Sequence, residues 1–267
     1  MLRQLTVNVR IFWQGTLLSY IGMFHWLRPT TYLASKVLMP LAQILFFTLL
    51  GIYASGRENA SFYVIGNAVQ ISAVSGIYGV TMSIGGDRWN GTLPYLFGTP
   101  ANRFFLFVGR AFMHVIDGML GVVVGLMWGV LLLGLDLSST DLPALALTIL
   151  VTTLSCSGMG LLMGCVGLIT TNIMFVNNSV YFLLLIFSGA NIPVDRLPVV
   201  FQALAQGLPL TRGITSARAL IAGASLESVL PLLLGELAVG LAYGLAGFWL
   251  FRWFETKAKQ KGSLETV

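Results

Sequence analysis

The chain has 267 residues, of which 56% are hydrophobic and 9% are charged, and its formal net charge is +5. A soluble domain carries roughly 25% charged residues, and the mean hydropathy of this chain is +0.85. These values exclude a soluble globular enzyme and a disordered tail protein, because most of the chain has no polar surface to present to water. The composition is typical of an all-α, polytopic membrane protein with little mass outside the bilayer.

The N-terminal region, residues 1–32, is too polar to span a bilayer, but its apolar residues recur at helical spacing. It predicts an amphipathic helix in the cytoplasmic membrane interface, as a plain anchor or as part of a docking surface or lateral gate. Six apolar stretches follow within residues 33–254, and a spanning helix needs about 20 such residues. They are Leu33–Ala54, Phe62–Gly85, Phe104–Leu135, Leu142–Ile169, Ile173–Ser188 and Leu226–Phe254. The fifth is short, and residues 255–267 are expected to form a cytoplasmic tail.

Glycine recurs every fourth residue in three of these stretches. The third stretch has Gly121, Gly125 and Gly129, the fourth has Gly160 and Gly164, and the sixth has Gly240 and Gly244. Since glycine lets helix backbones approach closely within lipid, this spacing predicts the faces on which the spans meet.

The basic residues predict the orientation, because Lys and Arg favour the cytoplasmic side of membrane proteins. With a cytoplasmic N-terminus, four of the 15 fall in outside segments, namely Arg57, Arg196, Arg212 and Arg218. The other eleven (15 − 4) then lie inside. This asymmetry predicts that both termini are cytoplasmic and that the number of spans is even. We expect a multi-pass protein of the plasma (inner) membrane.

Catalytic motifs are absent from the sequence. It contains no Walker-type phosphate loop, His-Glu-x-x-His motif, Cys-x-x-Cys pair or nucleophile elbow. Cys156 and Cys165 fall on different faces of one apolar stretch, so a shared disulfide or metal is not expected. We therefore predict no catalytic residue, metal or cofactor in this chain, and any ATP must bind another chain.

Four ionisable residues lie inside predicted spans, where charge is costly and marks functional candidates by default. Arg110, His114 and Asp117 share one face of the third span, since they are spaced by four, three and seven residues. Two interpretations stay open for them: a self-neutralising ion pair with a hydrogen-bonded histidine, or a role in a pathway or gate. Glu236, in the sixth span, is expected to bond to a neighbouring span or to the pair Asn177–Asn178, or to serve function.

Two connections differ from plain loops. Residues 87–103 follow the second span and contain the apolar run Leu93–Phe97. They predict a short cytoplasmic helix that presents these side chains to a soluble partner or rests in the interface. Residues 189–223 hold three prolines, and a helical stripe runs from Leu197 to Leu208. This segment is expected to dip into the outer leaflet or lie along it without crossing.

These two connections resemble those of the ATP-binding-cassette type-2 permease family, the membrane subunits of one class of bacterial and archaeal exporters. In that family the first connection carries an acidic residue (often Glu), Arg, Gly-Thr-Leu, Thr-Pro and a basic residue. The matching residues here are Asp87, Arg88, Gly91, Thr92, Leu93, Thr99, Pro100 and Arg103. The second connection resembles the family's series of Ser-Gly, Pro, Leu-Pro, Pro-Leu-Thr and Arg-Ala-Leu. Its matching positions include Gly189, Pro193, Leu197, Pro198, Pro209 and Arg218.

The resemblance covers nearly the whole chain and implies a role for each segment. Residues 87–103 would be the coupling helix that docks on a nucleotide-binding subunit, and residues 189–223 the re-entrant helices of an extracellular gate. Two permeases, identical or paralogous, would lie in lipid above two cassette ATPase subunits that bind ATP and Mg²⁺. No nucleic acid partner is expected. The expected cargo is a hydrophobic small molecule, a drug or a lipid-like amphiphile.

Three alternatives stay open. A polysaccharide or glycolipid exporter would line its channel with aromatic rings, but the tryptophans do not gather on one surface of the sequence pattern. A membrane-embedded lipid-modifying enzyme needs a polar cluster near an interface, and only Arg110, His114 and Asp117 approach one. A secondary transporter with broken helices would show paired interrupted spans, whereas this sequence has one irregular segment without a mate.

Overall fold

The computed structural model describes residues 2–26, 28–168, 170 and 172–261. Ile169, where the fourth predicted span ends, residue 1 and residues 262–267 of the predicted tail lie outside this set. In chain order the elements are α1 (Leu2–Trp26), α2 (Pro29–Ser55), η1 (Arg57–Asn59), α3 (Ala60–Ala73), η2 (Val74–Gly79), α4 (Val80–Trp89), α5 (Leu93–Gly98), α6 (Arg103–Leu133), α7 (Leu142–Gly167), α8 (Ile173–Phe187), η3 (Val194–Arg196), α9 (Val199–Gly207), α10 (Thr211–Ile221) and α11 (Leu226–Lys261). No strand occurs in the described residues, which confirms the all-α prediction.

Five helical rods in the described part of the chain are long and apolar enough to cross a membrane. They are Pro29–Ser55, Arg57–Arg88, Arg103–Leu133, Leu142–Gly167 and Leu226–Lys257. The second rod joins α3, η2 and α4, with η2 as a π-helical turn in its middle. The fifth predicted span folds as α8, which has 15 residues and a length of about 22 Å at 1.5 Å per residue. Because the hydrocarbon core is about 30 Å thick, the count of six spans stays a prediction.

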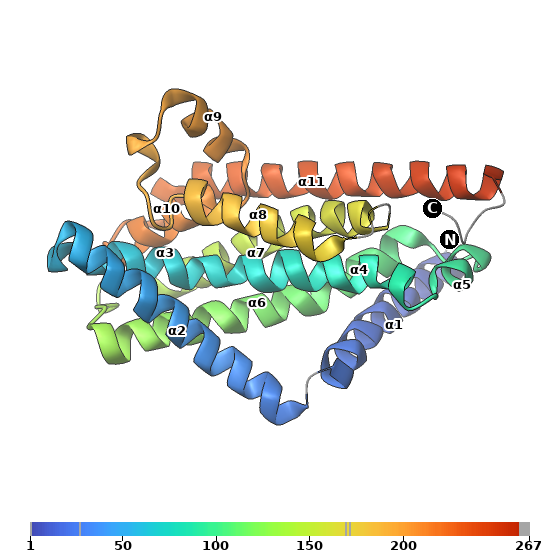
Figure 1. Cartoon of the computed structure of the whole chain (residues 1–267), viewed down its shortest axis with the longest axis horizontal. Helices are drawn as coiled ribbons and strands as arrows, with labels where there is room; N and C mark the ends of the chain where they lie inside the picture. The colour runs from blue at the N-terminus through green and yellow to red at the C-terminus, as the bar shows by residue number, and fades with distance from the viewer. Residues whose placement is uncertain (1, 27, 169, 171, 262–267) are drawn as a thin grey trace.

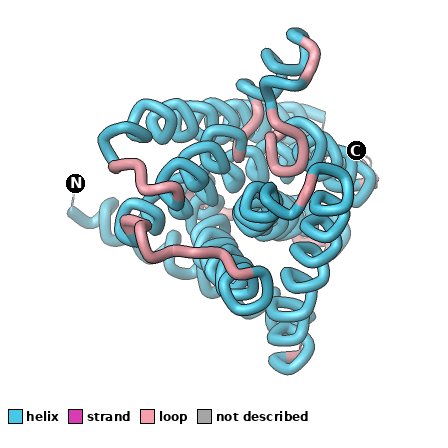
Figure 2. The backbone as a smooth tube through the Cα atoms, turned by 90° about the vertical axis from the view of Figure 1, so that its left-hand side faces the viewer, coloured by secondary structure: helices cyan, strands magenta, loops and turns pink. Residues whose placement is uncertain are grey.

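The first turns of α1 and the last turns of α11 lie at one end of the bundle. Figure 1 shows the start of α1, the short helix α5 and the end of α11 together, and we name this region the α5 end. The opposite region holds η1, the α6–α7 connection and α9, and we name it the α9 end. Helix α9 and its flanking loops stand above the bundle there, as the view onto that end also shows (Figure 2).

Local sequence fixes where several helices begin and end. Asn102, Asp141 and Asn172 cap α6, α7 and α8, and each side chain accepts a bond from a backbone N–H of the first turn. Gly134 ends α6 with φ +68°, a left-handed conformation that favours glycine. These caps hold the turns between neighbouring rods short.

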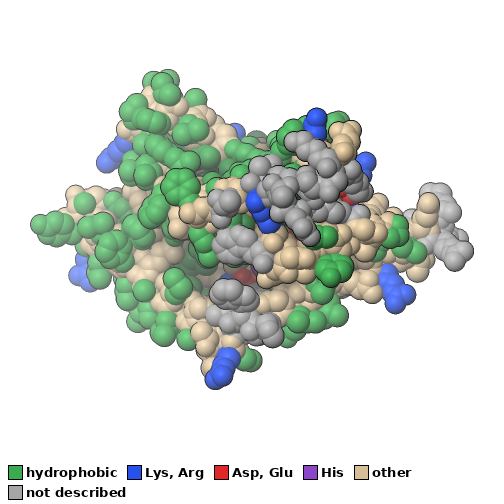
Figure 3. Space-filling model, turned by 45° about the vertical axis from the view of Figure 1, so that its right-hand side comes forward, with side chains coloured by type: hydrophobic (Ala, Val, Ile, Leu, Met, Phe, Trp, Pro, Cys, Tyr) green, Lys and Arg blue, Asp and Glu red, His purple; other side chains and the backbone are tan. Residues whose placement is uncertain are grey.

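The rods differ in how far they lie inside the bundle. Within the most apolar 18 residues of each rod, 72% of the residues are buried in the α3–α4 rod and 67% in α7, but only 22% in α2 and 22% in α11. Glycine brings α7 into backbone contact with α11, since a Cβ added at Gly158 would overlap the carbonyl oxygen of Gly240. On the other side of α7, Gly160 meets the carbonyl oxygen of Gly76 in the same manner. In Figure 3 hydrophobic side chains gather mainly toward the left of the view, and Lys and Arg side chains are scattered around its edges and over its right half.

Candidate functional site

The turn before α5 is built around Gly91. The backbone N–H of Gly91 donates to the Arg88 carbonyl at 3.2 Å, and that of Thr92 donates to the Asp87 carbonyl at 2.9 Å. This pair of bonds, with φ +65° at Gly91, is a Schellman motif that ends α4 and starts a new direction. The glycine of the Gly-Thr-Leu motif is therefore required by the turn itself.

Asp87 and Arg110 form an ion pair that ties this turn to α6. Arg110 Nη1 lies 2.6 Å from Asp87 Oδ2 and 2.8 Å from the carbonyl oxygen of Ser83. The Thr92 hydroxyl donates to Asp87 Oδ1 at 2.8 Å. The interpretation that Arg110 neutralises Asp117 is thus wrong, because the Arg110 side chain extends toward the α5 end and α4 supplies its carboxylate.

Arg103 fixes the segment after α5 from the other side. Its Nη2 lies 3.2 Å from Glu255 Oε1 on α11, and donates to the Thr99 carbonyl at 2.9 Å. Both charged side chains are buried. Arg88 in turn donates to the Leu168 carbonyl at 3.1 Å, beside the α7–α8 connection. The charged residues of the motif therefore bond inside the protein and hold the loop in shape.

The outward surface of the loop is smaller than the sequence predicted. Leu93 is 5% exposed and packs with Phe107 and Phe251, whereas Tyr95 is 77% exposed. Gly91, Thr92, Thr99 and Pro100 are exposed beside it. The expectation that the whole run Leu93–Phe97 faces outward is wrong at Leu93, since the helix buries that side chain in the core of the α5 end.

A second polar cluster lies at the middle of the bundle, around Asp117. Asp117 Oδ2 accepts from Lys36 Nζ and from the Ser75 hydroxyl, each at 2.5 Å, and Oδ1 accepts from the Tyr32 hydroxyl. Lys36 and Tyr32 come from α2, and Ser75 comes from η2. Asp117 is 4% exposed, so α2 and the π-helical turn provide its counter-charge and hydrogen bonds.

His114 lies one turn from Asp117 on α6 but forms no hydrogen bond to it in the structure. Its Nε2 is buried without a hydrogen-bond partner in the structure, and its ring lies against Gly79 of η2, where a Cβ would collide with it. The hydrogen-bonded histidine of the ion-pair interpretation is therefore not observed. The π-helical turn η2 interrupts the regular α-helix of the α3–α4 rod beside His114, and π-helical turns are often found at functional sites.

The segment at the α9 end is held by Arg218 of α10. Its guanidinium donates to the carbonyl oxygens of Gly189, Ala190 and Phe62 at 2.9, 3.0 and 2.9 Å, and stacks 3.5 Å from the Phe62 ring centroid. Gly189 turns the chain after α8 with φ +87°. Arg218 thus fastens the return segment to the start of α3 through carbonyl dipoles.

Glu236 is fully buried and bonds to the same segment. Its Oε1 accepts from the Leu210 N–H at 2.6 Å, and its Oε2 accepts from the Gly213 N–H at 3.3 Å. It therefore caps the N-terminus of α10 from the neighbouring helix. The expectation of a bond to Asn177 or Asn178 is wrong, because Asn178 bonds to Tyr78 and the polar atoms of Asn177 have no hydrogen-bond partner in the structure.

The remaining predicted gate residues shape the return segment. Pro193 precedes η3, Leu197 ends it, and Pro198 precedes α9 with φ −54°. Pro209 is buried between α9 and α10. Leu210 has φ +89°, a strained backbone conformation for leucine. The hydrogen bond from its N–H to Glu236 stabilises this strained turn.

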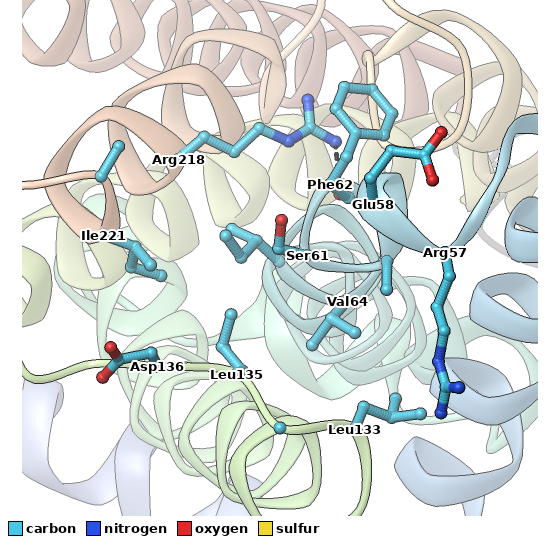
Figure 4. A pocket seen from close by; sticks show the side chains of 14 residues that line it. Arg57, Glu58, Ser61, Phe62, Val64, Leu133, Leu135, Asp136, Arg218 and Ile221 are labelled. Atoms are coloured by element: carbon cyan, nitrogen blue, oxygen red, sulfur yellow. Dashed lines mark hydrogen bonds between the residues drawn. The ribbon is translucent and has the colours of Figure 1, made fainter.

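A pocket of about 590 Å³ opens at the α9 end between η1, α6 and α10. Figure 4 shows Arg57 and Glu58 on one side, Asp136 and Arg218 on others, and apolar side chains such as Val64 and Leu135 between them. The Ser138 backbone N–H donates to Asp136 at 2.8 Å and lowers its pKa, so this acid stays ionised at neutral pH. The pocket combines an apolar floor with charges of both signs.

An apolar groove of about 360 Å³ lies between α6 and α11, and α7 also lines it. Phe104, Phe107, Phe112 and Phe248 line it with small residues of the α7–α11 contact. No group of three or more His, Cys, Asp or Glu in the described residues could hold a metal ion. The two cysteines are buried and free.

Sequence reasoning missed the partners of the predicted residues. Lys36, Tyr32 and Ser75 surround Asp117, and Glu255 binds Arg103. Lys36 within an apolar stretch is itself the signal that could have pointed to a buried acid. Glu255 gave no such signal, because a glutamate at the end of a span is expected to face water.

Together, the apolar rods and the polar sites between them define a multi-pass helical membrane protein. None of the curated proteins compared with the chain matches it. Residues 14–222 match the family described as ABC-2 type transporter, which covers most of the chain. The protein therefore belongs to the ABC-2 type transporter family, as a permease subunit of an ABC transporter. Members of this family associate in general with ATP-binding-cassette subunits.

Proposed function

We propose that the chain is the permease subunit of an ATP-driven exporter that forms its pathway as a dimer, identical or paralogous, on separate cassette ATPase subunits. ATP and Mg²⁺ bind those subunits, and this chain carries no cofactor. The observation that supports this most is the shape of the α5 loop. Tyr95 projects from a loop held by Asp87–Arg110 on one side and Arg103–Glu255 on the other. An exposed side chain on a loop held rigidly at both ends is suited to transmit movement from an ATPase subunit bound to it.

The proposed orientation places the α5 end in the cytoplasm of a cell with this protein in its plasma (inner) membrane. The start of α1 and the end of α11 share that end with α5, which agrees with an even number of crossings. We propose that α8 completes six crossings and that residues 189–223 form the extracellular gate. In this scheme α1 is the interface helix, since it packs on α6 and exposes Trp13 and Leu17.

The proposed cargo is a hydrophobic small molecule, a drug or a lipid-like amphiphile. The pocket at the α9 end supports an amphiphile, because charged groups ring an apolar floor there. The arrangement of Arg110, His114 and Asp117 weakens the lipid-modifying alternative, since Arg110 and Asp117 bond to different partners. Export then follows from different cargo affinities in two conformations of the dimer.

The test uses the purified chain in nanodiscs, alone and with a cassette ATPase subunit from the same organism. We expect no ATP hydrolysis by the chain alone, and binding of the ATPase subunit by the intact chain. Tyr95→Ala should weaken this binding, whereas Tyr53→Ala should not, although Tyr53 of α2 is the more exposed tyrosine (91% against 77%). Hydrolysis by the isolated chain, or equal binding by both variants, would refute the proposal.

A further inference from the structure

Two buried carboxylates on α11 bond to connecting segments at opposite ends of the molecule. Glu236 is 0% exposed and Glu255 is 6% exposed. A buried carboxylate near or within a bilayer is tolerated where hydrogen bonds or a counter-charge satisfy it. Glu236 finds its partners at the start of the short helix α10, and Glu255 pairs with Arg103, the first residue of α6, directly after the segment that follows α5.

At the α9 end, α11 holds the junction of α9 and α10. Glu236 accepts bonds from the N–H groups of Leu210 and Gly213 at 2.6 and 3.3 Å. The Tyr243 hydroxyl, two turns further along the same face of α11, donates to the Gly207 carbonyl at 3.0 Å. The end of α9 and the start of α10 are thus attached to one face of α11.

At the α5 end, α11 holds the segment that follows α5. Glu255 Oε1 lies 3.2 Å from Arg103 Nη2, and Arg103 donates to the carbonyl oxygens of Thr99 and Ala101 at 2.9 and 3.1 Å. The apolar side of α5 joins the same attachment, since Leu93 shares a buried cluster with Phe251 of α11. Movement of α5 therefore acts directly on the last turns of α11.

The helix between the two carboxylates is built to stay straight. Nineteen residues separate Glu236 from Glu255 (255 − 236), which is about 28 Å at 1.5 Å per residue. The helix is continuous there, and its internal proline, Pro231, lies outside this interval. Close backbone contacts at Gly240 and Gly247 join it to α7. The pair of helices acts as one stiff element across the bundle.

We propose that Glu236 and Glu255 are positioning residues of a single mechanical linkage between the ATPase-facing loop and the outer segment. Displacement of α5 passes through Arg103 and Glu255 to α11, and through Glu236 to the start of α10. The outer segment then moves when the loop moves, without any change in α11 itself. This inference rests on the proposed function, because the ATPase subunit supplies the displacement.

The experiment follows the outer segment directly. Val200 of α9 is 77% exposed and is replaced by cysteine, in a background where the buried Cys156 and Cys165 are alanine. An environment-sensitive fluorophore on Val200→Cys reports the outer segment in the full complex with its ATPase subunit in nanodiscs. ATP with vanadate is added, and the change in emission and the rate of ATP hydrolysis are measured on the same sample.

Glu236→Gln and Glu255→Gln each should reduce the emission change about tenfold, the scale expected from losing a charge-assisted hydrogen bond. For Glu236→Gln, ATP hydrolysis should stay near the parent rate, which an unfolded variant would not show. Glu255→Gln also alters a brace of the ATPase-facing loop, so its emission change is compared with that of the parent at equal amounts of bound ATPase subunit. Glu227→Gln, an exposed glutamate on the same helix, is the matched control and should keep the full signal. Tyr243→Phe removes one hydroxyl and supplies a milder variant at the outer attachment.

The outcomes separate the two proposals. A folded Glu236→Gln or Glu255→Gln complex that keeps the full emission change overturns the linkage. If Glu236→Gln does not fold, a full emission change in both Tyr243→Phe and Glu255→Gln overturns the linkage instead. Absence of ATPase binding, or of any emission change in the parent complex, refutes the proposed function instead.

Discussion

Asp117 offers the sharpest test of what holds α2 to the bundle. Asp117→Asn keeps the shape of the side chain but removes its charge, which leaves Lys36 facing an amide. Tyr32 and Ser75 donate to different oxygens of Asp117, so in asparagine one hydroxyl keeps its acceptor and the other must turn to accept from the amide NH2. The change therefore removes the ion pair and rearranges one hydrogen bond. Few residues in the apolar stretch of α2 are buried, so this ion pair adds to the packing of α2 on α3 and α6 and to the bond from Trp128 to the Val37 carbonyl.

The exposed fractions of the two side chains decide the magnitude. Breaking one partner of a buried ion pair costs about 3–5 kcal/mol, whereas hydrogen bonds within membranes average about 0.6 kcal/mol. The Lys36 side chain is 20% exposed and that of Asp117 is 5% exposed. Because Lys36 can relax toward polar surroundings, Asp117→Asn should lower the free energy of unfolding by about 3 kcal/mol. Lys36→Met leaves the more deeply buried carboxylate without a counter-charge and should lower it by about 5 kcal/mol.

The assay is unfolding of the purified chain in mixed micelles with increasing SDS, followed by circular dichroism. The double variant Lys36→Met with Asp117→Asn should cost less than the sum of the single variants by at least about 2 kcal/mol. Glu58→Gln makes the same acid-to-amide change at an exposed position and should stay within about 0.5 kcal/mol. Strictly additive costs in the double variant would show that the pair is not coupled, and the reasoning would fail.

Three further predictions concern packing, the return segment and the loop. Gly240→Ala should cost about 1–3 kcal/mol in the same unfolding assay, since its Cβ would collide with the α7 backbone, whereas Gly22→Ala, which meets no atom, should be neutral. Arg218→Met should speed proteolytic cleavage at the α9 end, because three carbonyl groups lose their donor. Asp87→Asn should weaken co-purification of the ATPase subunit, and the reversed pair Asp87→Arg with Arg110→Asp should recover part of it; no recovery would show that the ion pair does not shape the loop.

Periodic features of the chain were predictable because they depend on neighbours in the sequence. The long apolar stretches predict the rods, since a helix in lipid satisfies its own backbone. Gly91 predicts the turn before α5, and glycines such as Gly160 and Gly240 predict faces where helices touch. Even the partial errors have this origin: Leu93 was placed outward because a run of apolar residues does not tell which one the helix buries.

Pairings between charged residues were decided by the tertiary structure alone. Arg110 could reach Asp117 along its own helix, yet it bonds to Asp87, and Lys36 from another helix takes Asp117. Glu236 and Glu255 likewise bond to segments far away in the sequence.

The amino-acid sequence by itself therefore determined that the chain is a helical membrane protein and where turns separate its helices, because hydropathy and backbone conformation depend on neighbouring residues. Only the packing decided which charges meet, because a charge in a low-dielectric interior bonds to the partner that lies within a few ångströms in space.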